Sequence, residues 1–165
     1  MDKLEFEGTV INGLGKHREL LVPGRSLLPQ APPDWPETLQ PGSLNLKVSS
    51  YPPMWRGRGL GNSVRELDLG TFLPQFVISQ DELGNNLLSP TPSKPKRGIG
   101  QVWRASLAAN GGELDCWILR RIESGLRDVL ELVSGYPIRS RMGLERTRDW
   151  PATVTVYGHW RVQSK

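Results

Sequence analysis

The chain has 165 residues, a net charge of +4 and a sequence pI of about 9.5. Its hydrophobic fraction of 37% and charged fraction of 23% are typical of a folded, water-soluble protein and exclude a largely disordered one. No stretch approaches the roughly 20 apolar residues of a membrane-spanning helix, and the N-terminus carries no apolar secretion signal. We therefore expect one domain over residues 1–165, with no membrane partner and a cytoplasmic location.

Cys116 is the only cysteine, which excludes an internal disulfide and a multi-cysteine zinc site. It lies in the apolar run Cys116-Trp117-Ile118-Leu119, a context that predicts a small buried thiol. The 14 prolines and 18 glycines favour many short elements joined by turns over long helices.

The first elements in chain order are strands. Residues 4–11 alternate apolar and polar side chains, which predicts a strand with one buried face, and residues 12–15 form a turn. Strand character resumes at residues 20–22. The six prolines of residues 23–41 predict an irregular segment, and strict alternation predicts a strand over residues 44–48.

The middle of the chain, residues 49–100, is a long insert rich in proline and glycine. Within it, residues 71–79 are expected to form a strand, which Pro74 confines to an edge or a strand start. Beyond it, residues 102–107 and 114–119 flank Asn110-Gly111-Gly112. Asn and Gly accept the positive φ angles of tight turns, so a hairpin is predicted here.

One short helix is predicted near residues 124–134, capped by Ser124 and ended by Gly135. Its apolar side chains fall at i, i+3, i+4 and i+7, as expected for one helical face: Leu126, Val129, Leu130 and Val133. A last strand follows over residues 152–157. Strands outnumber helices by about six to one, which favours a mostly-β fold closed into a small barrel because closure removes exposed edges.

A loop with a glycine-rich, basic sequence joins the first two strands. Its residues are Gly13, Leu14, Gly15, Lys16, His17 and Arg18. Glycines let the backbone approach a ligand, and successive N–H groups with nearby basic side chains can hold an anion. The alternative is an ordinary hairpin loop with solvated charges. The loop is not a Walker motif, because no Gly-Lys-Ser/Thr ends it.

The segment Pro41-Gly42-Ser43-Leu44-Asn45 is the second candidate. With Leu44 pointing inward, Ser43 and Asn45 share the other face of the strand. A hydroxyl and an amide oxygen are ligands that Mg²⁺ accepts when substrate phosphates supply the remaining oxygens. The alternative is a plain turn that enters a strand.

Glu131 and Arg139 complete the candidate site. Glu131 lies off the apolar helical stripe beside Arg127, where it either forms a surface ion pair or accepts a substrate hydroxyl. Arg139, just after Tyr136-Pro137, either clamps a nucleotide as a planar fork of donors or is solvated.

Three ordered sets of residues carry a family resemblance. They are Glu7-Gly8-Thr9-Val10-Ile11-Asn12-Gly13-Leu14-Gly15, then Pro41-Gly42-Ser43-Leu44-Asn45-Leu46, then Val129-Leu130-Glu131-Leu132-Val133 with Tyr136-Pro137-Ile138-Arg139. In this order they resemble the archaeal CTP-dependent riboflavin kinase family, across both ends and about half of the chain. The resemblance implies a six-stranded cradle-loop barrel with little helix.

The resemblance also implies an activity, the transfer of the γ-phosphate of CTP to riboflavin to give FMN and CDP, with Mg²⁺ as cofactor. The loop of Gly13, Leu14, Gly15, Lys16, His17 and Arg18 would contact the CTP phosphates and ribose. The cytosine would be framed by Tyr136, Pro137, Ile138 and Arg139. Ser43, in the place of a family threonine, and Asn45 would bind Mg²⁺. Glu131 would face the ribityl chain, so Glu131 and Asn45 are the expected catalytic residues.

The chain departs from the family pattern at two further places. His17 replaces a glycine, and Arg121-Ile122-Glu123 stands where a threonine would touch the flavin. These departures motivate an alternative, a nucleotide- or flavin-binding barrel without kinase activity. The basic excess and six tryptophans motivate a further alternative, a nucleic-acid-binding barrel, although no nucleic-acid motif is present.

Overall fold

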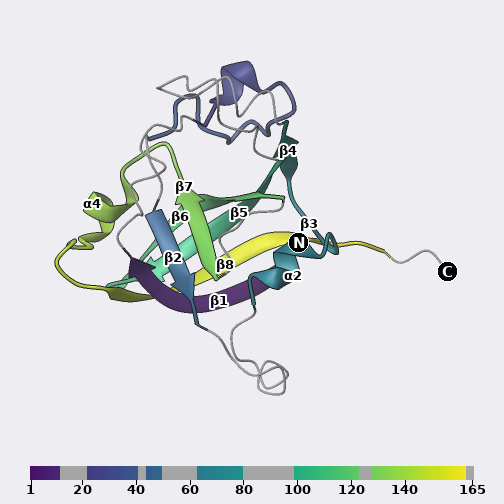
Figure 1. Cartoon of the computed structure of the whole chain (residues 1–165). Coiled ribbons are helices and arrows are strands. Elements are labelled where there is room, and N and C mark those ends of the chain that lie inside the picture. Colours follow the sequence, from purple (N-terminus) through teal and green to yellow (C-terminus); the bar gives the residue numbers. More distant parts are fainter. Residues whose placement is uncertain (12–21, 41–43, 50–62, 80–98, 123–127, 163–165) are drawn as a thin grey trace, which may run out of the picture.

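Six antiparallel strands close into a barrel (Figure 1). Their order around the barrel is β8-β1-β2-β7-β6-β5, and the pairing of β5 with β8 closes it. The expected mostly-β fold with a small closed barrel is therefore confirmed.

The computed structural model describes residues 1–11, 22–40, 44–49, 63–79, 99–122 and 128–162. The barrel strands are β1 (Asp2–Ile11), β2 (Leu44–Val48), β5 (Gly100–Ala109), β6 (Gly112–Arg121), β7 (Val129–Val133) and β8 (Trp150–Trp160). The other elements within these ranges are η1 (Arg25–Leu27), α2 (Arg65–Asp68), β3 (Phe72–Leu73), β4 (Phe76–Ile78) and α4 (Ile138–Met142). No helix among the described residues is long and apolar enough to cross a bilayer.

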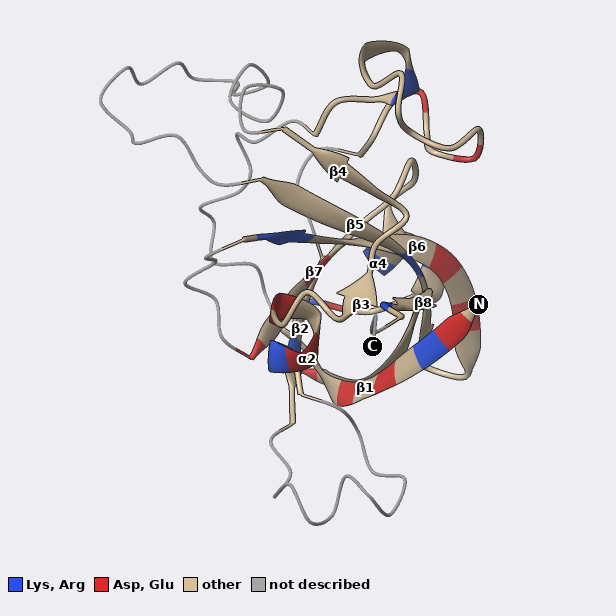
Figure 2. Ribbon diagram, turned by 90° about the vertical axis from the view of Figure 1, so that its right-hand side faces the viewer, with Lys and Arg blue, Asp and Glu red and all other residues tan. Residues whose placement is uncertain are grey.

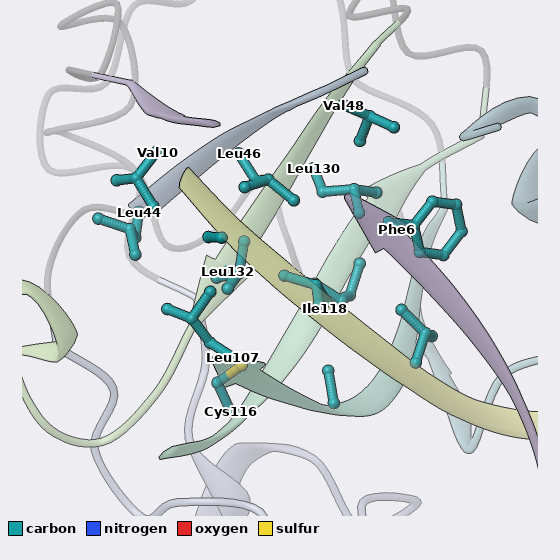
Figure 3. Packing of buried hydrophobic residues seen from close by; sticks show 14 of the residues in the cluster. Phe6, Val10, Leu44, Leu46, Val48, Leu107, Cys116, Ile118, Leu130 and Leu132 are labelled. Carbon is teal, nitrogen blue, oxygen red and sulfur yellow. The ribbon is translucent and has the colours of Figure 1, made fainter. Parts of the chain in front are cut away.

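The barrel interior is filled by the inward-facing half of each strand. In β1 the side chains of Leu4, Phe6 and Val10 are buried in this core, and charged side chains alternate with them on the outside, as the bands along β1 show (Figure 2). Figure 3 shows how side chains from all around the barrel meet in its centre. Those with no exposed surface include Phe6, Leu46, Leu107, Ile118 and Leu130.

The predicted hairpin is confirmed at the turn between β5 and β6. Ala109 pairs with Gly112, which leaves a two-residue turn of Asn110 (φ 51°) and Gly111 (φ 75°). Two consecutive positive φ angles match the right-handed twist of paired strands, and Asn-Gly adopts them at the lowest steric cost.

The helix predicted near residues 124–134 is wrong, because Val129–Val133 forms β7, between β2 and β6. Leu130 and Leu132 point into the barrel, while Val133 packs in a second cluster outside it. Val129 and Val133 on the outer face are apolar like the inward Leu130, so the apolar spacing of β7 also fits a helical stripe. Within the part of the chain that is described, the helix of this region is α4, further along.

The predicted strand over residues 71–79 is broken in two. Pro74 separates β3, which pairs with the end of β8, from β4, which pairs with the start of β5. The irregular segment predicted over residues 23–41 is confirmed as far as residue 40, with η1 as its one regular turn among the described residues. Residue 22 lies in no strand, and residues 20 and 21 fall outside the described ranges.

Two short helices close opposite ends of the barrel (Figure 1). At one end, Leu67 of α2 packs in the barrel core, and Asp68 pairs with the buried Arg120 of β6 (Nε to Oδ1, 2.6 Å). At the other end, Ile138 and Met142 of α4 pack in the same core, beside the start of β6.

A segment that we call the strap, residues 22–40, crosses the outside of the barrel beside β4 (Figure 1). Side chains of the strap and of the barrel wall form a second apolar cluster there. The strap contributes Leu28, Trp35 and Leu39, and β4, β5, β6 and β7 contribute Phe76, Ile78, Val102, Trp117, Leu119 and Val133. The strap has little regular structure, so its position depends on this side-chain packing.

The expected burial of the Cys116 thiol is confirmed. The residue lies in the barrel core, and only 4% of its surface is exposed. Burial, with the nearby Asp115 carboxylate, raises the pKa of the Cys116 thiol to about 12. The reactive thiolate is therefore almost absent at neutral pH. We expect no labelling by a thiol-specific disulfide reagent until the barrel opens, measured as absorbance against time; rapid labelling of the native protein would contradict this packing.

The ion pair of Asp34 with Arg104 should make the stability of the strap pH-dependent. The hydrogen bond from Arg104 lowers the pKa of Asp34. The pair therefore stabilises the fold fully at pH values above the unfolded-state pKa of Asp, about 3.9. This stabilisation is lost as the pH falls through the lower pKa of Asp34 in the folded protein. Both side chains are partly exposed, so we expect Asp34→Asn to cost only about 0.2–1 kcal/mol at pH 7. Urea unfolding should show this difference shrinking below about pH 4; a difference independent of pH would contradict it.

Candidate functional site

Three residues from separate sequence motifs lie in one row across the barrel wall. Asn45 of β2 pairs directly with Ile11 of β1 on one side and with Glu131 of β7 on the other. Ile11 is the last residue of β1, two positions before Gly13 of the glycine-rich loop, and Asn45 follows Ser43 by two positions. The register of the sheet therefore brings Ile11, Asn45 and the candidate carboxylate of Glu131 to the same place.

Asn45 and Glu131 share the outer face of the barrel. Their strand neighbours Leu44, Leu46 and Leu130 belong to the inner core, and side chains alternate along a strand. On this outer face both residues are nevertheless buried, with 3% of Asn45 and 9% of Glu131 exposed. Asn and Glu are seldom so buried without polar partners, and two adjacent buried oxygen-bearing side chains are a feature that core packing does not require.

Arg139 connects this row to the last predicted motif. Its Nη2 donates to the carbonyl of Ile11 (3.4 Å) and its Nη1 to the carbonyl of Leu144 (3.1 Å). Burial, and then the nearby charge of Arg146, lowers the pKa of Arg139. The Arg139 guanidinium at the end of β1, with the positive charge of Arg146 near it, makes a place where a bound anion would be stabilised.

Tyr136 is held at the turn between β7 and α4. Its backbone N–H donates to the Oγ of Ser134 (2.9 Å), and its phenol donates to the carbonyl of Asp115. The guanidinium of Arg141 lies 4.4 Å from the centre of its ring, within the range of a cation–π contact. Burial is the main cause that raises the pKa of the Tyr136 phenol, so this ring stays neutral.

Pro137 and Ile138 have different surroundings, although they are neighbours. Pro137 is exposed at the start of α4, whereas Ile138 is 6% exposed and packs in the barrel core. A ligand at this turn could reach the Pro137 ring but only the backbone of Ile138.

Seven of the predicted site residues fall outside the described ranges. They are Gly13, Leu14, Gly15, Lys16, His17, Arg18 and Ser43. Among the described residues, the structure brings Asn45, Glu131 and Arg139 to one region. The predicted helical neighbour of Glu131, Arg127, also lies outside the described ranges, and the helix on which that pairing depended is absent from Val129–Val133.

Arg121 is a further candidate site residue. The sequence indicated it only as part of the segment that replaces a family threonine. It is 9% exposed and shares the outer face of β6 with Trp117 and Leu119, which lie in the outer apolar cluster. Leu119 pairs directly with Glu131, so Arg121 lies diagonally from Glu131 across the β6–β7 pair. The side chains of residues 117–121 alternate between the two faces of the strand, and this pattern could have placed Arg121 on the outer face with Trp117 and Leu119.

The donor set fits a hard divalent cation that is shared with a ligand. Asn45 offers an amide oxygen and Glu131 a carboxylate on adjacent strands, and Mg²⁺ is bound by few protein oxygens when phosphates and waters complete its shell. Within the described residues, no group of three or more His, Cys, Asp or Glu side chains could hold a metal by itself. A cation here would therefore need ligands beyond those clustered side chains.

Comparison with known proteins adds no name to this site. No protein-family model matches the chain, and no curated protein matches it significantly.

Proposed function

We propose that the chain is a CTP-dependent riboflavin kinase, which transfers the γ-phosphate of CTP to the terminal hydroxyl of riboflavin to give FMN and CDP. One observation carries the proposal: Ile11, Asn45 and Glu131 lie side by side in the sheet, with the Arg139 guanidinium on the Ile11 carbonyl. Three motifs that together span more than a hundred residues of sequence thus share one region, as a single nucleotide site would require.

In the proposed site the nucleotide lies at the α4 end of the barrel. Arg139 and Arg146 would face its anionic phosphates, and the exposed Pro137 and half-buried Tyr136 would contact the cytosine. Arginine suits this role because its charge persists at any physiological pH and its planar fork matches phosphate oxygens.

Asn45, together with Ser43 of the preceding segment, would hold Mg²⁺ through neutral oxygens. When bound, the ion would neutralise charge on the β- and γ-phosphates. Strand pairing on both sides of β2 would keep the Asn45 amide oxygen in a buried, fixed position.

Glu131 would accept a hydrogen bond from the terminal hydroxyl of the ribityl chain. That oxygen forms a bond to the γ-phosphorus of CTP while the bond from the γ-phosphorus to the bridging oxygen breaks. CDP leaves with the electron pair of the bridge, and the hydroxyl proton passes to Glu131 and then to water. Since phosphoryl transfer depends chiefly on position and charge neutralisation, one carboxylate is sufficient.

Replacing Glu131 by glutamine is expected to lower kcat by about 10²-fold or more in a variant that still folds, because glutamine keeps the size and polarity of the side chain. The measurement is steady-state FMN formation. A Glu131→Gln variant with wild-type kcat would exclude the carboxylate from the reaction.

The direct test of the proposal is incubation of the chain with riboflavin, CTP and Mg²⁺, followed by chromatography of the flavins. Accumulation of FMN in step with CDP supports the proposal, and a parallel reaction with ATP identifies the phosphate donor. No FMN with either nucleotide would remove the kinase assignment.

A second candidate, a nucleotide- or flavin-binding barrel without turnover, is favoured by one observation. Arg121 brings a buried positive charge to the face that carries Glu131, close to the place proposed for the acceptor. Thermal unfolding distinguishes the candidates, since a ligand at 100 times its Kd stabilises the native state by about 2.7 kcal/mol. Stabilisation by CTP or a flavin without FMN formation would favour the binding module.

A further inference from the structure

The turn from β7 into α4 carries an arginine side chain over a tyrosine ring. Tyr136 is half-buried and packs against the barrel core, and the guanidinium carbon of Arg141 lies 4.4 Å from the centre of its ring. Arg141 itself is exposed. On the side of the ring that Arg141 covers, a ligand that arrives from solvent therefore meets the guanidinium and only the rim of the phenol.

The ring under Arg141 is fixed at both of its ends. The Oγ of the buried Ser134 accepts from the N–H of Tyr136 (2.9 Å) and donates to the carbonyl of the same residue (2.6 Å). At the far end, the phenol donates to the carbonyl of Asp115 in β6. Because the ring is held through its backbone and through its hydroxyl, it supports the guanidinium at a defined place.

The guanidinium of Arg141 is not used by a carboxylate. Among the described residues no acidic side chain pairs with it, in contrast to Arg104 and Arg120, each of which binds an aspartate. The backbone N–H of Arg141 donates to the carbonyl of Pro137 (3.2 Å), which leaves the charged end of the side chain with the tyrosine ring as its described contact. The outer face of the guanidinium is thus available to a ligand.

Arg139 and Arg141 lie on different sides of α4. Positions two apart on a helix point about 200° apart, and the face that separates these two packs into the core through Ile138 and Met142. Arg139 donates to the carbonyl of Ile11 at the end of β1, whereas Arg141 lies over the ring that follows β7. Since a nucleotide carries its phosphates and its base at opposite ends, one molecule can meet both arginines.

We propose that Arg141 is the stacking platform for the nucleobase: held over Tyr136, its guanidinium packs against the base of the nucleotide whose phosphates face Arg139. This inference rests on the proposed function and adds a residue that determines nucleotide affinity. Bases stack on guanidinium planes as they do on aromatic rings. Such stacking accepts any base, so Arg141 contributes affinity for a base rather than a choice among bases.

The test replaces Arg141 by lysine, which keeps the positive charge but removes the planar group that stacks. We expect the Kd for Mg²⁺–CTP and the KM for CTP to rise about fivefold. The Kd for Mg²⁺–tripolyphosphate, which has the phosphates but no base, should stay within about twofold of wild type. The kcat should not change, because the base takes no part in the transfer. Calorimetry and steady-state FMN formation measure these constants.

Arg148→Lys is the matched control. The guanidinium of Arg148 lies over the ring of Trp150 (3.6 Å), so this substitution removes the same kind of contact and keeps the same charge. It should leave the Kd for Mg²⁺–CTP within about twofold of wild type. A rise of the same size in both variants would overturn the proposal, because the loss would then not be particular to Arg141.

Two further results would overturn it. An equal rise in the Kd for CTP and for tripolyphosphate in Arg141→Lys would place the guanidinium on the phosphates instead of the base. A lower thermal midpoint with an unchanged Kd for CTP would leave the contact with Tyr136 a purely structural role. Calorimetry is therefore carried out at a temperature where both variants are fully folded.

Binding and turnover keep the two hypotheses distinguishable. If the wild-type chain binds CTP but forms no FMN, the kinase assignment fails, and a selective loss of CTP affinity in Arg141→Lys still supports the platform. If the wild type forms FMN and Arg141→Lys binds CTP equally well, the platform alone is overturned. A wild-type chain that binds neither CTP nor tripolyphosphate would overturn both.

Discussion

Replacing Asn45 by alanine is expected to lower kcat/KM for FMN formation by about 10²–10³-fold, the range found when one preorganised electrostatic contact is removed from an active site. The side chain lies on the outer face of β2, opposite Glu131, and its amide oxygen is the described metal ligand of the proposed site. The effect should appear as a weaker apparent affinity for Mg²⁺ as well as a lower kcat. Steady-state kinetics over a range of Mg²⁺ concentrations measures both.

The matched control is Thr155→Ala. Thr155 is a half-buried polar residue of β8, a strand on the other side of the barrel that pairs with β1 and β5. It should retain wild-type kinetics, and circular dichroism should show both variants folded. Wild-type activity in Asn45→Ala would exclude Asn45 as a metal ligand, and an unfolded Asn45→Ala variant would show that its burial serves the fold.

Replacing Gly8 by alanine is expected to destabilise the barrel by about 1–3 kcal/mol or more, the cost of overpacking a closed structure. An added Cβ would lie 2.1 Å from the carbonyl oxygen of Lys47, at the point where Gly8 pairs with Val48. Neither backbone can move without parting β1 from β2, because each strand is also paired on its other side. Urea or thermal unfolding measures the loss.

Gly112→Ala is the matched control for this substitution. Gly112 also lies in a barrel strand, but an added Cβ there would have no atom nearer than 3.8 Å. We expect a change within about 0.5 kcal/mol. Equal stability of the two variants would show that β1 and β2 do not approach each other as closely as described.

Alternation of apolar and polar side chains predicted three of the barrel strands. Residues 4–11, 44–48 and 152–157 were recognised on this pattern, and each lies within an observed strand. The hairpin was recognised from the chemistry of its turn, since the turn requires positive φ angles that Asn110 and Gly111 accept readily. Local sequence is sufficient in these cases because the physical cause is local.

The failure at β7 has the opposite cause. Leu130 faces the barrel and Val133 faces the strap, so both sides of the strand carry apolar residues and the period of two is obscured. Because of that error, Glu131 was expected on the surface of a helix. In the structure it lies in a strand, beside Asn45. The two residues are 86 positions apart, and only the register of β2 with β7 makes them neighbours.

The contacts of the strap could not be predicted from the sequence either. Asp34 and Arg104 are separated by 70 residues, and nothing in the spacing of either indicates its partner. The irregularity of residues 23–40 was predictable from their prolines, but its position over Trp117 and Phe76 depends on tertiary packing. Candidate residues could thus be named from sequence, whereas their relative placement could not.

The most direct test of the account is a crystal structure of the chain with CTP and Mg²⁺. The account predicts the triphosphate at the α4 end of the barrel, with the Asn45 amide oxygen on the metal ion and the Arg139 guanidinium next to the nucleotide. Glu131 should lie on the side of the γ-phosphate where the acceptor hydroxyl would approach. A nucleotide bound elsewhere on the barrel, with Asn45 and Glu131 remote from it, would contradict the account.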